Sequence, residues 1–138
     1  MAIKSLFPDK MMDAVSLNLD SIKAKLNYFD LQLHELHWAT RSLAEHLVLG
    51  DAYDKVADLK DEIVEKIMGY TGVRTKPMPV ETIKAYAPGV PDQVISELMT
   101  FAKQLEAFGE TNGMPDIENI AQSLSGDAAQ FKYRLTLS

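Results

Sequence analysis

Three histidines and a row of acidic residues are the side chains of this sequence that could do chemistry together. The histidines, His34, His37 and His46, fall within one short stretch. His34 and His37 are three positions apart, so they share one face of a helix. The acidic residues follow downstream at helical spacing and are Asp54, Asp58, Asp61 and Glu65. Imidazole and carboxylate groups without a thiolate form a ligand set that suits iron, zinc or manganese.

A simpler interpretation of the same residues needs no metal. Acidic side chains at helical spacing often form a solvated face, and Lys55, Lys60 and Lys66 offer them neighbours of opposite charge. A histidine near a helix end often interacts only with the helix dipole. Trp38 and Tyr53 are interpreted first as aromatic anchors that pack the end of a helical bundle, with electron transfer as an alternative role for Trp38.

Apolar residues at alternating steps of four and three predict the helices that would carry these groups. The predicted seams are, helix by helix, Val15, Leu19, Ile22, Leu26, Phe29, Leu33 and Leu36; Ala52, Val56, Leu59, Ile63 and Ile67; Val94, Leu98, Phe101, Leu105 and Phe108; and Ile117, Ile120, Leu124, Ala128, Phe131 and Leu135. A first helix is predicted from Asp9 or Asp13 to Ser42, and a second from Asp51 to Tyr70. Gly50 is expected in a left-handed conformation at the break between them, with Asp51 as the cap of the second helix. Two antiparallel helices joined by a short loop would bring the acidic row towards the histidines.

The second half of the sequence predicts two more helices after a long connection. Proline and glycine clusters from 73 to 91 indicate a crossover, interrupted by a short helical stretch from Glu81 to Tyr86. Helices are predicted at about Asp92–Phe108 and Pro115–Leu135. We therefore expect an all-α, antiparallel four-helix bundle that forms a single domain over 1–138, with its long crossover between helices two and three.

Composition limits the classes of protein to which the chain could belong. Its 138 residues are 46% hydrophobic and 25% charged, which is typical of a globular domain. No apolar run is long enough to predict a membrane span, and the absence of cysteine excludes thiolate chemistry. A net charge of −6 argues against nucleic-acid binding, because phosphates are neutralised by Lys and Arg. A cytoplasmic location is expected.

The segment from Leu33 to Gly72 resembles the signature region of the Dps-type miniferritins, a ferritin-like family. The matching features are a His-Trp pair, a second histidine beyond it, and an Asp-x-x-x-Glu pair on the second helix. Trp38 follows the first of these histidines. The resemblance implies metal ligands at four positions of this chain: His37, His46, Asp61 and Glu65.

In that family the histidines of one chain and the carboxylates of its partner share a site at a two-fold interface. The site binds and oxidises iron(II), and the subunits assemble into a hollow shell. The resemblance therefore implies a homo-oligomeric ferroxidase that uses dioxygen or peroxide. Two features depart from the pattern. The interval from His37 to His46 is shorter than the family's, whereas His34 to His46 fits it, so His34 is an alternative ligand. Gly50 stands where the family often has another carboxylate.

Two other functions belong beside the ferroxidase hypothesis. The chain could be a non-enzymatic helical bundle, with a structural, assembly or regulatory role in a bacterium or its phage, that retains the fold without a working metal site. DNA compaction, the third possibility, requires a basic surface that the sequence does not supply.

Overall fold

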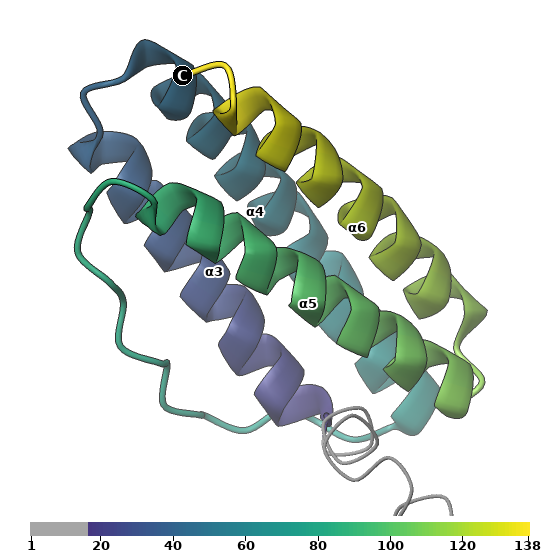
Figure 1. Ribbon diagram of the computed structural model, residues 1–138. Helices are drawn as coiled ribbons and strands as arrows, with labels where there is room; N and C mark the ends of the chain where they lie inside the picture. The colour runs from purple at the N-terminus through teal and green to yellow at the C-terminus, as the bar shows by residue number, and fades with distance from the viewer. Residues whose placement is uncertain (1–16) are drawn as a thin grey trace, which may run out of the picture.

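Four helices make up most of the chain in the computed structural model, which describes residues 17–138. They are α3 (Leu19–Ala39), α4 (Leu43–Thr71), α5 (Val90–Thr111) and α6 (Pro115–Leu135). Short turns join α3 to α4 and α5 to α6, whereas the crossover, residues 72–89, runs back along the length of the bundle (Figure 1). No strand occurs in this part of the chain. The predicted all-α four-helix bundle with a crossover between its second and third helices is confirmed.

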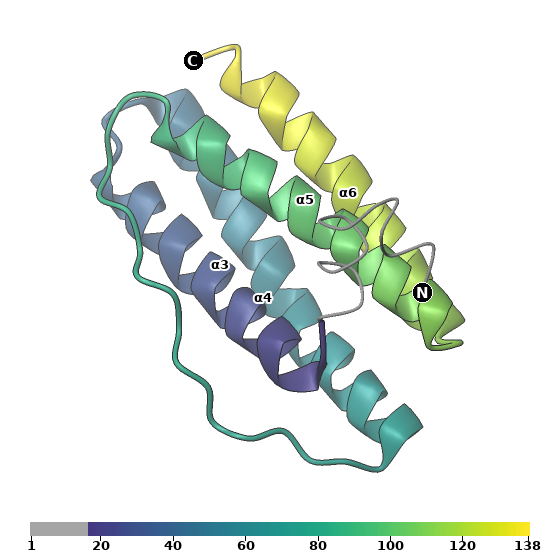
Figure 2. The ribbon, with the colours of Figure 1, turned by 60° about the horizontal axis from the view of Figure 1, so that its bottom comes forward.

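The helices pack in a ring in which each neighbour runs antiparallel to the next. α3 packs chiefly against α4 and α5, and α6 against the same two helices. The crossover lies along the outside of α3 (Figure 2). No helix in the described part combines the length and apolar character that a membrane span requires.

The predicted apolar seams form the core between the helices. In α4, α5 and α6 every predicted seam residue is buried except Leu59 and Ile120, which are partly exposed. In α3 the seam is buried from Ile22 to Leu36, Leu19 is partly exposed, and Val15 lies outside the described residues. Burial of each large apolar side chain stabilises the bundle by about 1.5–3 kcal/mol.

The turn between α3 and α4 comprises residues 40–42, upstream of the break predicted at 49–51. The side chain of Ser42 caps α4 by accepting a hydrogen bond from the Glu45 N–H at 3.2 Å. This cap satisfies one of the unpaired N–H groups that begin every helix. Gly50 consequently lies inside α4, and its predicted role as a left-handed helix terminator is wrong.

The beginning of α3 also differs from the prediction. The start expected at Asp9 or Asp13 lies outside the described residues. Within them, α3 begins after Asn18, whose side chain accepts from the Ser21 N–H while the Ser21 hydroxyl accepts from the Asn18 N–H, both at 2.9 Å. This reciprocal pair is a capping box, which fixes the start of the helix.

The crossover contains no helix between residues 72 and 87, so the short helix predicted at 81–86 is wrong. The buried side chain of Gln32 in α3 explains the difference. It accepts from the Lys84 N–H at 2.6 Å and donates to the Lys84 carbonyl at 3.0 Å. Both backbone groups that a helix would use are therefore bound to α3 instead.

Candidate metal site at the turn between α3 and α4

His37 and His46 face each other across the turn, from the last turn of α3 and the first turn of α4. Nδ1 of His37 lies 2.8 Å from the backbone oxygen of His46, and Nδ1 of His46 lies 2.9 Å from that of His37. The rings stack with centroids 3.8 Å apart. Because a carbonyl oxygen only accepts, each Nδ1 donates its proton. The neutral form of an imidazole that donates from Nδ1 carries its lone pair on Nε2, the nitrogen that a metal could bind.

Gly50 makes this close pairing possible. A Cβ at this position would lie 3.0 Å from Cε1 and 3.2 Å from Nδ1 of His37. Any side chain there would crowd the ring that donates to His46. The absence of a side chain at Gly50 thus leaves room for the histidine pair.

His34 belongs to a separate aromatic stack. Its ring centroid lies 3.9 Å from that of Trp38 and 4.0 Å from that of Tyr53, whose ring is nearly parallel to it. The centroid of His37 is farther away, at 6.2 Å. The structure therefore pairs His46 with His37 rather than with His34. Trp38 is 63% exposed, so the prediction that it is an anchor packing the end of the bundle is wrong.

The acidic row lies on the outer face of α4, away from the core. Its four members are exposed and form no ion pair with any described residue: Asp54, Asp58, Asp61 and Glu65. The three neighbouring lysines bind other acids, namely Asp127, Asp30, Glu62 and Asp116. The row therefore concentrates uncompensated negative charge along one helix.

Asp61 and Glu65 do not meet the histidines of their own chain. His46 and both carboxylates lie on α4, and a helical rise of about 1.5 Å per residue places Asp61 about 22 Å from His46 along the axis. No group of three or more His, Asp or Glu among the described residues could hold a metal. The expectation that the two helices bring the acidic row to the histidines is therefore wrong within one chain. At the turn, a single chain brings together the two histidines without Asp61 or Glu65.

A polar cluster that sequence reasoning missed supports the turn. Oε1 of Glu45 accepts from the Thr40 hydroxyl at 2.6 Å and from the Tyr86 hydroxyl of the crossover at 2.8 Å. The bond to Glu45 raises the pKa of Tyr86. The pattern Ser42-x-x-Glu45, with its serine cap and its acid three residues later, is a helix-start signal that could have revealed the turn.

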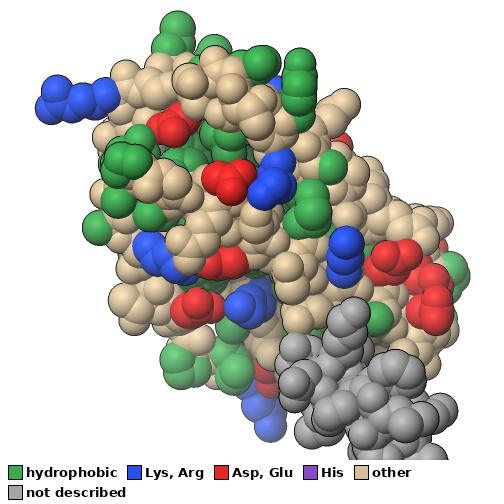
Figure 3. Space-filling view, in the orientation of Figure 1, with side chains coloured by type: hydrophobic (Ala, Val, Ile, Leu, Met, Phe, Trp, Pro, Cys, Tyr) green, Lys and Arg blue, Asp and Glu red, His purple; other side chains and the backbone are tan. Residues whose placement is uncertain are grey.

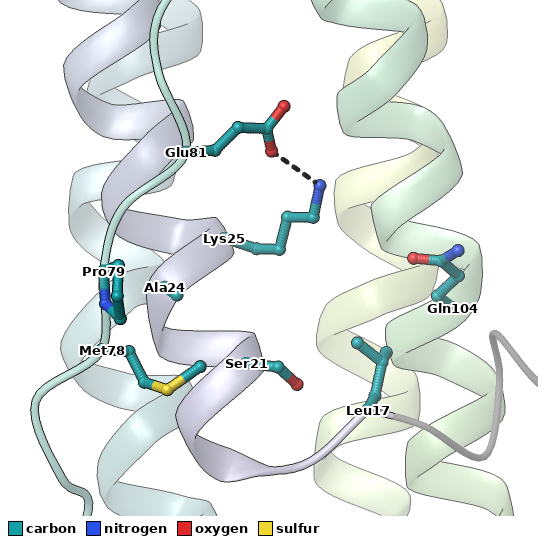
Figure 4. Close-up of a pocket in the computed structure, with 8 residues that line it drawn as sticks. All are labelled: Leu17, Ser21, Ala24, Lys25, Met78, Pro79, Glu81 and Gln104. Carbon is teal, nitrogen blue, oxygen red and sulfur yellow. Dashed lines mark hydrogen bonds and ion pairs between the residues drawn. The ribbon is translucent and has the colours of Figure 1, made fainter.

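A concavity of about 430 Å³ lies between α3, the crossover and α5 (Figure 4). Lys25 and Glu81 form an ion pair of 3.2 Å in its wall, and each compensates the charge of the other. The remaining lining residues are neutral: Leu17, Ser21, Ala24, Met78, Pro79 and Gln104. Acidic and basic side chains also lie side by side over this face of the molecule (Figure 3). The histidine pair is therefore the stronger candidate for chemistry.

Fold and site together define a helical-bundle protein with a paired-histidine turn. The model of a family of unknown function, DUF5856, matches residues 37–135, and the chain belongs to this family. The match spans both paired histidines and the whole acidic row. No curated protein and no solved structure matches the chain.

Proposed function

We propose that this protein binds iron(II), as a substrate, at a site shared by two copies of the chain. His37 and His46 of one copy and Asp61 and Glu65 of the other would hold the ion. The observation that carries the proposal is the reciprocal bonding of the histidines, which fixes both protons on Nδ1. Metal-binding histidines commonly donate their other ring N–H to a carbonyl in this way.

The acidic row supports the carboxylate part of this proposal. Asp61 and Glu65 are four positions apart on α4, so their Cβ atoms lie about 6 Å from each other on one face. A second copy related by a two-fold axis perpendicular to α4 would run its α4 antiparallel to the first. Its acidic end would then approach the histidine end of its partner, and symmetry would create two such sites.

Exposed apolar side chains support the association of copies through the outer face of α3 and α4. Leu31, in the middle of α3, is 47% exposed, and Trp38, Leu43 and Leu47 are more exposed still. Exposed apolar patches often mark protein–protein contacts. We therefore propose that the protein is a homo-oligomer. We place it in the cytoplasm, a reducing compartment, which suits a protein that binds iron(II).

The reaction proposed for this site is the oxidation of iron(II) by dioxygen or peroxide. Each iron(II) loses one electron to the oxidant, and the ferric product hydrolyses. Neutral imidazoles and anionic carboxylates are ligands suited to iron, zinc or manganese. The carboxylates would also offset the positive charge that increases on oxidation.

Complementation between two inactive variants tests both the chemistry and the sharing of the site. One variant carries His37→Ala and His46→Ala, the other Asp61→Asn and Glu65→Gln. Iron(II) is added in air and near-ultraviolet absorbance is followed. We expect each variant alone to lose the iron-dependent rise, and an unfolded-and-refolded mixture to recover part of it. A matched control, Asp54→Asn with Asp58→Asn, should retain the activity. Equal rates in all samples would refute the proposal.

A non-enzymatic bundle that acts through its surface is the second candidate. It is favoured by the exposure of Trp38 and of Leu43, which is 71% exposed. In this case the histidine pair serves only to tie α3 to α4. Normal association of the copies, combined with iron oxidation no faster than in buffer, would support this function over the first.

A further inference from the structure

A tyrosine of the crossover supports the histidine pair from outside the helices that carry it. We infer that Tyr86 is a positioning residue: through Glu45 it holds the α3–α4 turn in the geometry that lets His37 and His46 exchange hydrogen bonds. The effect of Tyr86 on metal affinity rests on the proposed function. Its effect on the hydrogen bonds of the metal-free histidines is independent of that function.

The contacts within the turn show how Glu45 is tied to it. The Thr40 N–H donates to the Leu36 carbonyl at 3.0 Å and closes α3. The Thr40 hydroxyl oxygen accepts from the Ser42 N–H at 3.1 Å, and the same hydroxyl donates to Glu45 at 2.6 Å. Ser42 in turn caps the Glu45 N–H. Both the backbone and the side chain of Glu45 therefore bind residues of the turn.

Tyr86 adds the tie from the crossover. Its ring packs against the edge of the core, and its hydroxyl donates to the oxygen of Glu45 that also accepts from Thr40. Apart from bonds to the adjoining ends of α4 and α5, the other polar ties between described residues of the crossover and the helices are made to Asp20, Lys23, Lys25, Tyr28, Gln32 and Glu97. Tyr86 is thus the crossover residue whose hydrogen bond reaches the turn.

The histidines stand next to the residues that this network fixes. His46 follows Glu45 directly, and His37 follows Leu36, the residue to which Thr40 is bonded. The two histidine bonds run in opposite directions between the same two backbone segments. A small displacement of α4 from α3 therefore lengthens both bonds together, and hydrogen bonds weaken steeply with distortion. Loss of the Tyr86 hydroxyl would therefore weaken the hydrogen bonds of both imidazoles together.

The test uses the full-length chain with the substitution Tyr86→Phe, which removes the hydroxyl and keeps the ring. NMR of the metal-free protein follows the imidazole nitrogens and the exchange of their protons. We expect the Nδ1 protons of His37 and His46 to exchange faster than in the wild type and the Nε2-protonated tautomer to appear, with His34 unchanged. Calorimetric titration with Zn²⁺, a redox-inert probe, should show about tenfold weaker binding, the lower end for outer partners of metal ligands.

Two further variants separate positioning from general loosening. Glu81→Gln removes the charge from the ion pair between the crossover and Lys25 and should leave the histidine protons and Zn²⁺ affinity unchanged. Glu45→Gln keeps an oxygen that can accept from Tyr86, so its histidine proton exchange and Zn²⁺ affinity should stay close to those of the wild type. Glu45→Ala removes this acceptor and should change both quantities as Tyr86→Phe does. Thermal unfolding confirms that each variant is folded.

The outcomes distinguish this inference from the proposed function. Wild-type histidine signals in Tyr86→Phe, or an equal change in Glu81→Gln, would overturn the positioning role whatever Zn²⁺ does. Altered histidine signals in Tyr86→Phe, together with an absence of Zn²⁺ binding by every variant and the wild type, would support the positioning role. That outcome would refute the proposed metal site and leave the positioning role of Tyr86 standing.

Discussion

The two helix pairs of this bundle both combine apolar seams with polar ties, but each has one kind of contact that sets it apart. α5 and α6 are tied by the ion pair of Lys132 with Asp92, and Gly109 brings their backbones into contact. α3 and α4 are tied by the ion pair of Asp30 with Lys60, and the rings of His37 and His46 stack between them. The backbone contact of the first pair serves packing, whereas the stacked rings of the second pair are groups that could do chemistry.

Two helical glycines show the same difference at single positions. A Cβ at Gly109 would lie 2.8 Å from the backbone nitrogen of Glu118, whereas a Cβ at Gly50 would meet the ring of His37 at 3.0 Å. Backbone cannot move aside without shifting a helix, but a side chain can rotate. Gly109 is therefore needed for the packing of the scaffold, and Gly50 for the arrangement of the candidate site.

The largest contrast is expected between a core leucine and a leucine on the outer face. Leu98 of α5 is fully buried, so Leu98→Ala should lower the free energy of unfolding by about 3 kcal/mol through lost burial and a residual cavity. Leu31 is 47% exposed, and Leu31→Ala should change the stability of the isolated chain by only about 0.5 kcal/mol. Urea denaturation at a concentration that favours the monomer measures both. Similar losses in the two variants would contradict the division into scaffold and outer face.

Substitution of Gly109 tests the backbone contact between α5 and α6. Gly109→Ala should destabilise the protein by about 1–3 kcal/mol, because its methyl group would overpack against Glu118. Gly126 in α6 is the matched control, since no heavy atom outside the local backbone of its own helix and its two chain neighbours lies within 4 Å of its would-be Cβ. Gly126→Ala should instead stabilise the helix by about 1 kcal/mol. Equal shifts in the melting temperatures of the two variants would show that close packing at Gly109 does not matter.

The fold was more predictable from the sequence than the site was. Seams such as Val94 to Phe108 have one spacing and one physical meaning, because only a helix buries them all. Gly50-Asp51 was misleading because a glycine followed by an acid is also the pattern of a helix end. The true turn carries the weaker Ser42-x-x-Glu45 signal, and the contacts formed across it are visible only when α3 and α4 are packed together.

The histidine pair was predicted only in part for the same reason. The resemblance implied His37 and His46 as ligands, and the structure brings the two rings together. Their reciprocal bonds use backbone carbonyls, which every residue carries, so that residue type gives no signal for them. Tyr86 lies far from Glu45 in sequence, and nothing in its surroundings indicates that the crossover brings it to the turn.

Gly50→Ala should alter the arrangement of the candidate site while changing the stability of the protein little. Alanine gains about 1 kcal/mol of helix propensity over glycine inside α4, and crowding of the His37 ring should offset most of it. The net change in unfolding free energy is expected to be within about 1 kcal/mol of zero. The imidazole NMR signals of His37 should nevertheless shift, because the ring is displaced. Unchanged histidine signals together with full helix stabilisation would mean that α4 accommodates the methyl group without touching the pair.

The smallest expected effect concerns the far end of the crossover. Asp20 of α3 accepts from the Lys76 N–H at 2.8 Å and from the Thr75 hydroxyl at 2.9 Å, and these bonds, the backbone bond first, lower the pKa of Asp20. A carboxyl whose pKa is lower in the folded state adds stability above its ordinary value of 3.8, and this contribution is lost as the pH falls through the folded value. Urea unfolding should therefore give a difference between the wild type and Asp20→Asn that is constant above roughly pH 5 and shrinks on acidification. The histidine signals at the opposite end of the bundle should not follow this titration. A difference that stays constant down to acid denaturation would show that the tie to Lys76 does not depend on the charge of Asp20.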